Sequence, residues 1–268
     1  MKPSEILLLL TLVTGVICLI QKIVKQKRQS VMHISNRTTV LGRFYNKVVE
    51  ISQSFFPVLL LVILLRSFVV EAFRIPSGSM QPTLLEGDFI LVNKYCYGLK
   101  LPVTGQTLWK MGAPERGDVV VFSKGRKDMI KRIVGLPGDR IRYENKILYV
   151  NDKPMLQVFQ DDVLAVPQQW KGWPFRRHTE HLDSKTHDIL LKMDNSLSQS
   201  KMIYPYQSVT VPEGSYYVLG DNRDNSLDSR YWGFVKASTL QGRAFAIFTS
   251  IDWENRALRW NRLFTGIS

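Results

Sequence analysis

The sequence contains only two cysteines and four histidines, and both shortages exclude classes of protein. Cys18 lies in a long apolar run and Cys96 in an aromatic segment, so a disulfide would join two unlike parts of the chain, and we expect none. With no CxxC pair and scattered histidines, we expect no metal and no cofactor. His178 and His181 are expected to be solvated loop residues. No segment recurs with a period of roughly 20 to 50 residues, which argues against a repeat protein.

The positive charge of the chain is concentrated near the N-terminus. A formal net charge of +13 and an isoelectric point near 9.8 would permit nucleic-acid binding. Much of the excess lies between two apolar runs, where only Glu50 opposes Lys22, Lys25, Lys27, Arg28, Arg37, Arg43 and Lys47. Basic clusters beside apolar runs set the orientation of membrane proteins. We therefore expect a lipid bilayer as a partner, and no nucleic acid.

The two apolar runs predict transmembrane helices. Residues 6–21 carry no charge, and extension to residue 24 approaches the roughly 20 residues that a spanning helix needs. The second run is uncharged from residue 51 through residue 65. We predict a first anchor over 1–24, a basic cytoplasmic loop over 25–50 and a second anchor over 51–70. A cleavable signal peptide is the alternative for the first run, but the basic cluster follows the apolar stretch instead of preceding it.

The basic loop also predicts which side of the membrane the rest of the chain occupies. Loops rich in lysine and arginine stay in the cytoplasm, so both termini and everything after residue 70 are expected on the opposite side. In a bacterium this side is the periplasm. The chain would then be a multi-pass protein of the bacterial inner (cytoplasmic) membrane with an exported domain.

The exported region, residues 71–268, has the pattern of a mostly β domain. Short runs of β-branched and aromatic residues are separated by glycine, proline and aspartate. The expected strands are 88–92, 118–122, 129–134, 140–143, 146–150, 208–211, 216–219 and 243–248, and the fourth and fifth of these form a predicted hairpin. Residues 160–205 are polar and irregular, and we predict that they form an insertion or a flexible excursion.

Two segments of this domain carry candidate catalytic residues. Ser79 lies among proline, glycine and serine directly after the second apolar run, a composition that by itself indicates only a turn. Lys131 lies in an apolar strand pattern, and strand alternation places Lys131 and Arg132 on opposite faces, so at least one of them faces packed structure. A solvated lysine on an edge strand is the alternative.

Serine and lysine together have a chemical use only if the lysine is buried. Serine is a poor nucleophile until a base takes its proton, and a lysine with the reference pKa near 10.4 is neutral only about 0.04% of the time at pH 7. Burial disfavours the ammonium, and each unit by which it lowers the pKa gives roughly tenfold more neutral amine. The apolar strand around Lys131 suits this requirement.

Five long motifs follow the apolar runs in order: PSGSMQPTL (76–84), GDFILVNK (87–94), RGDVVVF (116–122), IKRIVGLPGD (130–139) and GDNRDNSLDSRYWGFV (220–235). With the two anchors and the basic loop, they cover nearly the whole chain. This arrangement resembles bacterial type I signal peptidase (leader peptidase), in the Gram-negative form with two anchors. The resemblance implies a signal-peptidase/LexA-like β fold and a serine endopeptidase.

The resemblance assigns roles to matching positions of this sequence. Ser79 matches the nucleophile and Lys131 the general base, while the Ser77 hydroxyl and the Ser79 N–H match the oxyanion hole. Ser226 matches the serine that orients the lysine. The matching ion-paired framework consists of Arg132, Asp221, Asp228 and Arg230, and the walls of the substrate pockets are matched by Phe73, Ile75, Met80, Leu84 and Ile130. Because nearby carboxylates would stabilise the ammonium, we assign the two aspartates to arginine partners and not to Lys131.

The resemblance also implies the substrate, an exported preprotein whose signal peptide is cleaved after small residues at positions −3 and −1. Two alternatives stay open: a Ser/Lys protease that cuts itself or a regulatory partner, as LexA-like repressors do, and a non-catalytic, membrane-tethered β binding module. A Ser/His/Asp triad is not supported, because none of His33, His178, His181 and His187 lies in a recognisable setting.

Overall fold

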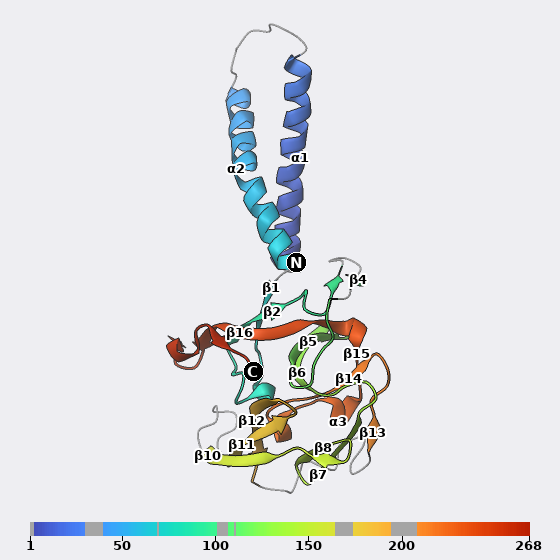
Figure 1. Ribbon diagram of the computed structural model, residues 1–268. Coiled ribbons are helices and arrows are strands. Elements are labelled where there is room, and N and C mark those ends of the chain that lie inside the picture. The colour runs from blue at the N-terminus through green and yellow to red at the C-terminus, as the bar shows by residue number, and fades with distance from the viewer. Residues whose placement is uncertain are drawn as a thin grey trace. The chain divides into compact units, whose positions relative to one another are not determined.

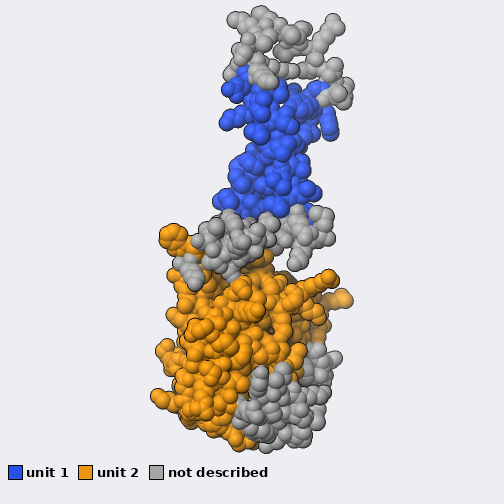
Figure 2. Space-filling model, turned by 90° about the vertical axis from the view of Figure 1, so that its right-hand side faces the viewer, with its two compact units in different colours: residues 1–69 blue, residues 70–268 orange. Residues whose placement is uncertain are grey.

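The computed structural model describes residues 3–29, 40–68, 70–100, 107–109, 111–163, 174–193 and 208–268. The chain divides into two compact units, Met1–Val69 and Val70–Ser268, which are coloured separately in Figure 2. The second unit begins one residue before the predicted start of the exported domain.

The first unit consists of two long helices, α1 (Pro3–Gln29) and α2 (Val40–Phe68). Within them Ile6–Gln26 and Gly42–Leu64 are long and apolar enough to cross a membrane. Both helices continue into the stretch 25–50 that we predicted as a loop, because lysine, arginine and glutamine are good helix formers. Residues 30–39, the centre of that stretch, lie outside the described residues.

Close packing between α1 and α2 depends on a small residue. A Cβ added to Gly15 would lie 2.8 Å from the Phe56 ring, so the ring occupies the space that a side chain would fill. Small residues at such positions let membrane helices approach closely. The Gln53 amide also donates a hydrogen bond to the Gln21 side chain across the pair. This hydrogen bond links the polar side chains of the two helices.

The second unit is mostly β, as predicted, and its strands form several antiparallel sheets (Figure 1). The largest sheet has the order β1-β2-β16-β5-β6-β14-β15, and β17 and β18 also pair with β16. Its strands are β1 (Val70–Arg74), β2 (Asp88–Asn93), β5 (Val119–Lys124), β6 (Lys127–Gly135), β14 (Ser215–Leu219), β15 (Val235–Lys236), β16 (Leu240–Asp252), β17 (Ala257–Leu258) and β18 (Thr265–Gly266). The predicted strands 88–92, 118–122, 129–134, 216–219 and 243–248 are therefore confirmed within a residue or two at most ends.

Smaller sheets flank the largest one. The predicted hairpin over residues 140–150 is confirmed as β7 (Arg140–Glu144) paired with β8 (Ile147–Val150). This sheet also contains β13 (Val209–Thr210) and β9 (Lys153–Pro154), and a separate pair is formed by β3 (Leu99–Lys100) and β4 (Thr107–Trp109). The short helical elements are η1 (Gly78–Met80), η3 (Arg223–Asn225), α3 (Ser229–Trp232), η4 (Ala237–Thr239) and η5 (Trp260–Arg262).

The predicted insertion contains a regular sheet. Its strands are β10 (Gln157–Val163), β11 (Phe175–Leu182) and β12 (Lys185–Lys192). Phe175, Leu182 and Ile189 are wholly buried, so the expectation that this region is irregular was wrong for the described residues. The half-buried His178 and His181 lie on β11 and are not loop residues. The remaining stretches of this region, 164–173 and 194–207, lie outside the described residues.

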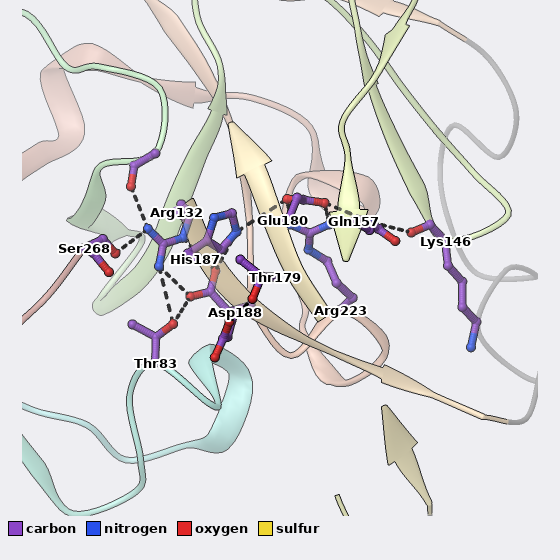
Figure 3. A network of polar contacts seen from close by, with 12 residues as sticks. Thr83, Arg132, Lys146, Gln157, Thr179, Glu180, His187, Asp188, Arg223 and Ser268 are labelled. Atoms are coloured by element: carbon purple, nitrogen blue, oxygen red, sulfur yellow. Dashed lines mark hydrogen bonds and ion pairs between the residues drawn. The ribbon is translucent and has the colours of Figure 1, made fainter. Parts of the chain in front are cut away.

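The sheet β10-β11-β12 is fastened to the chain before α3 by a buried ion pair. Arg223 in η3 makes two hydrogen bonds to the Glu180 carboxylate on β11, and neither side chain is exposed. Burial alone would raise the pKa of Glu180, but the Arg223 charge and His187 hold it well below its usual range. Figure 3 shows this pair beside His187 of β12. Loss of one partner would leave an uncompensated charge in the interior.

We expect Glu180→Gln to lower the free energy of unfolding by about 3 kcal/mol or more, because it leaves the Arg223 guanidinium buried without its counter-charge. Urea unfolding of the full chain in detergent, followed by tryptophan fluorescence, measures this. The matched control is Asp161→Asn on β10, whose carboxylate pairs with Arg177 at an exposed position. The control should cost no more than about 1 kcal/mol. Equal losses in the two variants would contradict the role of the buried pair.

Candidate active site

Ser79 lies in η1, a short turn that the core holds firmly in place. Its neighbour Met80 is fully buried, as is Leu84 just after the turn, and both belong to one apolar cluster with Ile90 of β2. The chain on either side is fixed by main-chain hydrogen bonds, such as that from Ile75 N to Asp88 O (2.8 Å). Ser79 itself is half-buried. A rigid turn with a partly accessible serine can present a hydroxyl group in one fixed direction.

Lys131 lies on β6, where both faces of the strand are covered. Alternation predicted that at least one of Lys131 and Arg132 would face packed structure, and both do: they are 3% and 1% exposed. The Lys131 Nζ lies 2.6 Å from the Ser79 Oγ, although the two residues are 52 positions apart in the sequence. The amine also donates to the Ile130 carbonyl oxygen at 2.8 Å. The fold therefore places a primary amine and a serine hydroxyl in direct contact.

Burial determines the charge of this amine. It lowers the pKa of Lys131 to about 8, against the opposing charges of Asp228 and Asp221 and with help from Arg230. An amine with this pKa is neutral in about a tenth of the molecules at pH 7, whereas an exposed lysine is neutral in about 0.04%. The site thus supplies roughly two orders of magnitude more free base than a solvated lysine does.

The two aspartates near Lys131 are each paired with an arginine. Asp221 accepts from the Nε and Nη2 of Arg132 at 2.9 and 2.8 Å. Asp228 accepts from the Nε and Nη2 of Arg230, both at 2.8 Å. Burial alone would raise the pKa of either carboxyl, but the arginine charges hold both pKa values below their usual range. The carboxylates are ionised and neutralised locally, which limits how strongly they stabilise the Lys131 ammonium.

Gly220 and Ser226 complete the wall behind the dyad. Ser226 is buried, and no hydrogen bond joins it to Lys131 in the described part of the chain. A Cβ added to Gly220 would come within 2.2 Å of the Ser226 Oγ and 2.4 Å of the Ser79 carbonyl oxygen. Only glycine fits at this position. The sequence could not predict this close approach, because it brings the segment 220–226 against Ser79, which is distant in the sequence.

The residues that the resemblance assigned to the substrate pockets differ in exposure. Ile75, Met80 and Leu84 are buried in the apolar cluster of the turn, whereas Phe73 and Ile130 are partly buried and pack against that cluster. Phe73 and Ile130 therefore keep the surface that a bound peptide could contact. The other three form part of the buried cluster against which these two residues pack.

Ser77 was assigned to the site by the resemblance, whereas His187 was given no role. Ser77 is exposed directly before η1, and its side chain makes no capping hydrogen bond to that turn. His187, for which the sequence gave no recognisable setting, is buried with its Nε2 3.4 Å from Glu180 and 3.8 Å from Asp221. Burial and the Arg132 charge lower its pKa. The burial of His187 could not be predicted, because the strand that contains it, β12, was not predicted.

A mostly β unit that holds a desolvated amine against a serine hydroxyl, in a chain with two apolar N-terminal helices, has the features of a membrane-anchored hydrolase. Comparison with known proteins agrees with this class. The family model described as signal peptidase, peptidase S26, matches residues 48–249. The chain belongs to this family of peptidases.

Curated relatives match over most of the chain. The signal peptidase I of Pseudomonas aeruginosa is 43% identical over 217 residues, covering 76% of this chain and 73% of the relative. That of Buchnera aphidicola subsp. Schizaphis graminum is 37% identical over 289 residues, covering 92% and 91%. A crystal structure of a signal peptidase I from Enterococcus faecalis is 32% identical and covers 49% of this chain and 96% of that chain, with a TM-score of 0.29.

We expect the kcat/KM for peptide cleavage to rise with pH through a midpoint of about 8. Only the neutral amine can accept the serine proton, so activity should fall about tenfold for each unit below that midpoint. Initial rates of the full chain in detergent between pH 6 and 10 measure the profile. Lys127→Ala, an exposed lysine on the same strand, should leave the midpoint unchanged. A midpoint near 10 would show that Lys131 is not the desolvated base.

Proposed function

We propose that this protein is a membrane-bound serine endopeptidase that removes signal peptides from exported preproteins with a Ser79/Lys131 dyad. The observation that carries the proposal is the 2.6 Å contact between the Ser79 Oγ and the Nζ of a lysine that is 3% exposed. Membership of the signal peptidase family supports the choice of substrate. No cofactor has a part in this chemistry.

In the first half of the reaction Ser79 becomes acylated. The neutral Lys131 amine accepts the hydroxyl proton while the Ser79 oxygen attacks the carbonyl carbon of the scissile peptide bond. The carbonyl electron pair moves to oxygen, and the resulting oxyanion accepts hydrogen bonds from the Ser79 N–H and the Ser77 hydroxyl. Collapse of this intermediate breaks the C–N bond, and the Lys131 ammonium gives its proton to the leaving amine.

In the second half water releases the signal peptide. Lys131, neutral again, accepts a proton from a water molecule that attacks the ester carbon, and a second oxyanion forms in the same hole. When it collapses, Ser79 Oγ leaves and takes the proton back from Lys131. Ser226, which makes no hydrogen bond to Lys131 in the described part of the chain, lines the wall behind the dyad together with Gly220. The buried pairs Arg132–Asp221 and Arg230–Asp228 provide the rigid backing.

The edge of the main sheet suits an extended substrate. β1, directly before the Ser79 turn, is the end strand in the order of that sheet. An extended peptide can add to such an edge through main-chain hydrogen bonds, and pockets for alternate side chains then give specificity. The partly buried Phe73 and Ile130, which pack against a buried apolar cluster, are the surface that we assign to small side chains at positions −3 and −1.

The charge of the first unit supports a location in the inner membrane with the catalytic unit in the periplasm. The basic residues between the two apolar helices favour the cytoplasmic side, so the chain after α2 would lie outside. A preprotein held in the bilayer by its own apolar segment would share that surface with the enzyme. Confinement of both to one membrane raises their effective concentration.

Ser79→Ala and Lys131→Ala should each lower the rate of preprotein cleavage by about 10⁴-fold or more, because the nucleophile and its base act as a unit. Lys131→Arg should fail equally, since a guanidinium stays protonated. Purified full-length variants are incubated with a preprotein, and the cut is mapped by mass spectrometry. Membrane insertion, measured by carbonate extraction, should be unchanged in all of them.

Lys127→Ala is the control, and it should cleave normally. Normal cleavage by either alanine variant at position 79 or 131 would rule out the dyad. If the unaltered chain cleaved only itself, a regulatory protease would be the better assignment. If it cleaved nothing, a binding module would be.

A further inference from the structure

Asn222 contacts the main chain of the nucleophile turn, the element η1 (Gly78–Met80) that carries Ser79, at two successive peptide groups. Its side-chain Nδ2 donates to the Gly78 carbonyl oxygen at 3.1 Å, and its backbone N–H donates to the Ser79 carbonyl oxygen at 3.2 Å. Asn222 is 1% exposed and lies 144 residues beyond Gly78 in the sequence. We propose that Asn222 is a positioning residue that aims the oxyanion hole; this inference rests on the proposed function.

The planarity of the peptide bond connects this contact to catalysis. The Gly78 carbonyl and the Ser79 N–H belong to one rigid, planar group and point in opposite directions. A hydrogen bond that fixes the Gly78 oxygen therefore also fixes the direction of the Ser79 N–H, the main-chain donor of the oxyanion hole. An oxyanion donor is effective only when it is held in place before charge develops. The second bond, to the Ser79 oxygen, holds the next peptide plane.

A bond within the turn does not replace this contact. The Gln81 N–H also donates to the Gly78 oxygen, at 3.1 Å, but it belongs to the same turn and moves with it. Gly78 has no side chain to restrict its peptide plane, and glycine adopts many backbone conformations. The bonds from Asn222 tie the turn to a different segment. The Gln81 hydrogen bond closes the turn, and the two Asn222 hydrogen bonds fix the orientation of that turn relative to the rest of the domain.

Asn222 is itself held on both sides by buried ion pairs. The preceding residue, Asp221, is paired with Arg132, and the following residue, Arg223, is paired with Glu180. Figure 3 shows Arg132 and the Arg223–Glu180 pair on either side of His187. Asn222 also forms a parallel bridge with Leu190 of β12. The sheet β10-β11-β12 thereby supports the segment that holds the Ser79 turn in place.

The position of the Asn222 side chain has an energetic cost. Its Oδ1 is buried and has no hydrogen-bond partner in the described part of the chain. An unsatisfied buried acceptor destabilises the folded state, so packing alone does not favour asparagine here. The amide orientation follows from its partner, because an oxygen facing the Gly78 oxygen would be repelled. The contribution of Asn222 to the site is therefore the N–H group that it directs at the Gly78 oxygen.

The test compares substrate turnover with binding of a transition-state analogue. A peptide aldehyde with the sequence before the cleavage site bonds reversibly to Ser79 Oγ, and its oxygen then occupies the oxyanion position. For Asn222→Ala we expect kcat to fall about 10- to 100-fold, less than or equal to the loss of a whole oxyanion donor. The KM and the midpoint of the pH profile should be unchanged. The Ki of the aldehyde should rise by the same factor by which kcat/KM falls.

Asn222→Asp provides a second variant of the same size. Its carboxylate cannot donate to the Gly78 oxygen, so it should lose kcat and aldehyde affinity at least as strongly, and it serves if the alanine variant does not fold. Asn93→Ala is the matched structural control, since the Asn93 side chain accepts from the Tyr95 and Cys96 N–H groups away from the turn. It should lower thermal stability and leave the ratio of Ki to KM unchanged.

A folded Asn222 variant that binds the aldehyde as tightly as the unaltered chain would overturn the inference, as would a change confined to KM. Failure of the proposed function gives a different result. In that case the unaltered chain would not cleave the preprotein, or Ser79→Ala would cleave it normally. The two failures are therefore separated by measurements on the same set of proteins.

Discussion

The contact between Ser79 and Lys131 depends on the exclusion of water from one amine. Both faces of β6 are covered at Lys131, and this burial keeps the pKa near 8 even with two carboxylates nearby. A lysine in the same contact but open to solvent would stay protonated and could only donate to the serine. The packing of β6 against β5 and the turn after β1 is therefore as much a part of the chemistry as the two side chains are.

The charges around this amine are arranged so that the interior remains neutral. Asp221 and Asp228 would favour the ammonium, and each is bound by an arginine that compensates its charge. A buried ion pair contributes little net stability, but removal of one partner is strongly destabilising. The pairs are best understood as rigid supports. One of them, Arg132–Asp221, lies between the dyad and the sheet formed by β10, β11 and β12, and the Arg223–Glu180 pair joins that sheet to η3.

The sequence predicted those elements whose signal is local. Apolar runs of sufficient length gave both helices, and alternation gave strands such as β2 and the hairpin of β7 and β8. The strands β11 and β12 were missed because charged residues, such as Arg177, which pairs with Asp161 across strands, interrupt their apolar pattern. Their buried residues are covered by parts of the chain that are distant in sequence. The helix ends were also set too short, since basic residues suggest a loop by charge but favour a helix by propensity.

The sequence by itself determined the kinds of chemical group available, a serine after the second helix and a lysine in an apolar strand, and their motifs were specific enough to indicate the family. Only the tertiary structure decided that the two meet at 2.6 Å, that both Lys131 and Arg132 are buried, and that Asn222 and Gly220 lie against the turn that carries Ser79. The physical reason is that desolvation and close approach are properties of a packed environment. They depend on atoms from segments far apart along the chain, which no local pattern records.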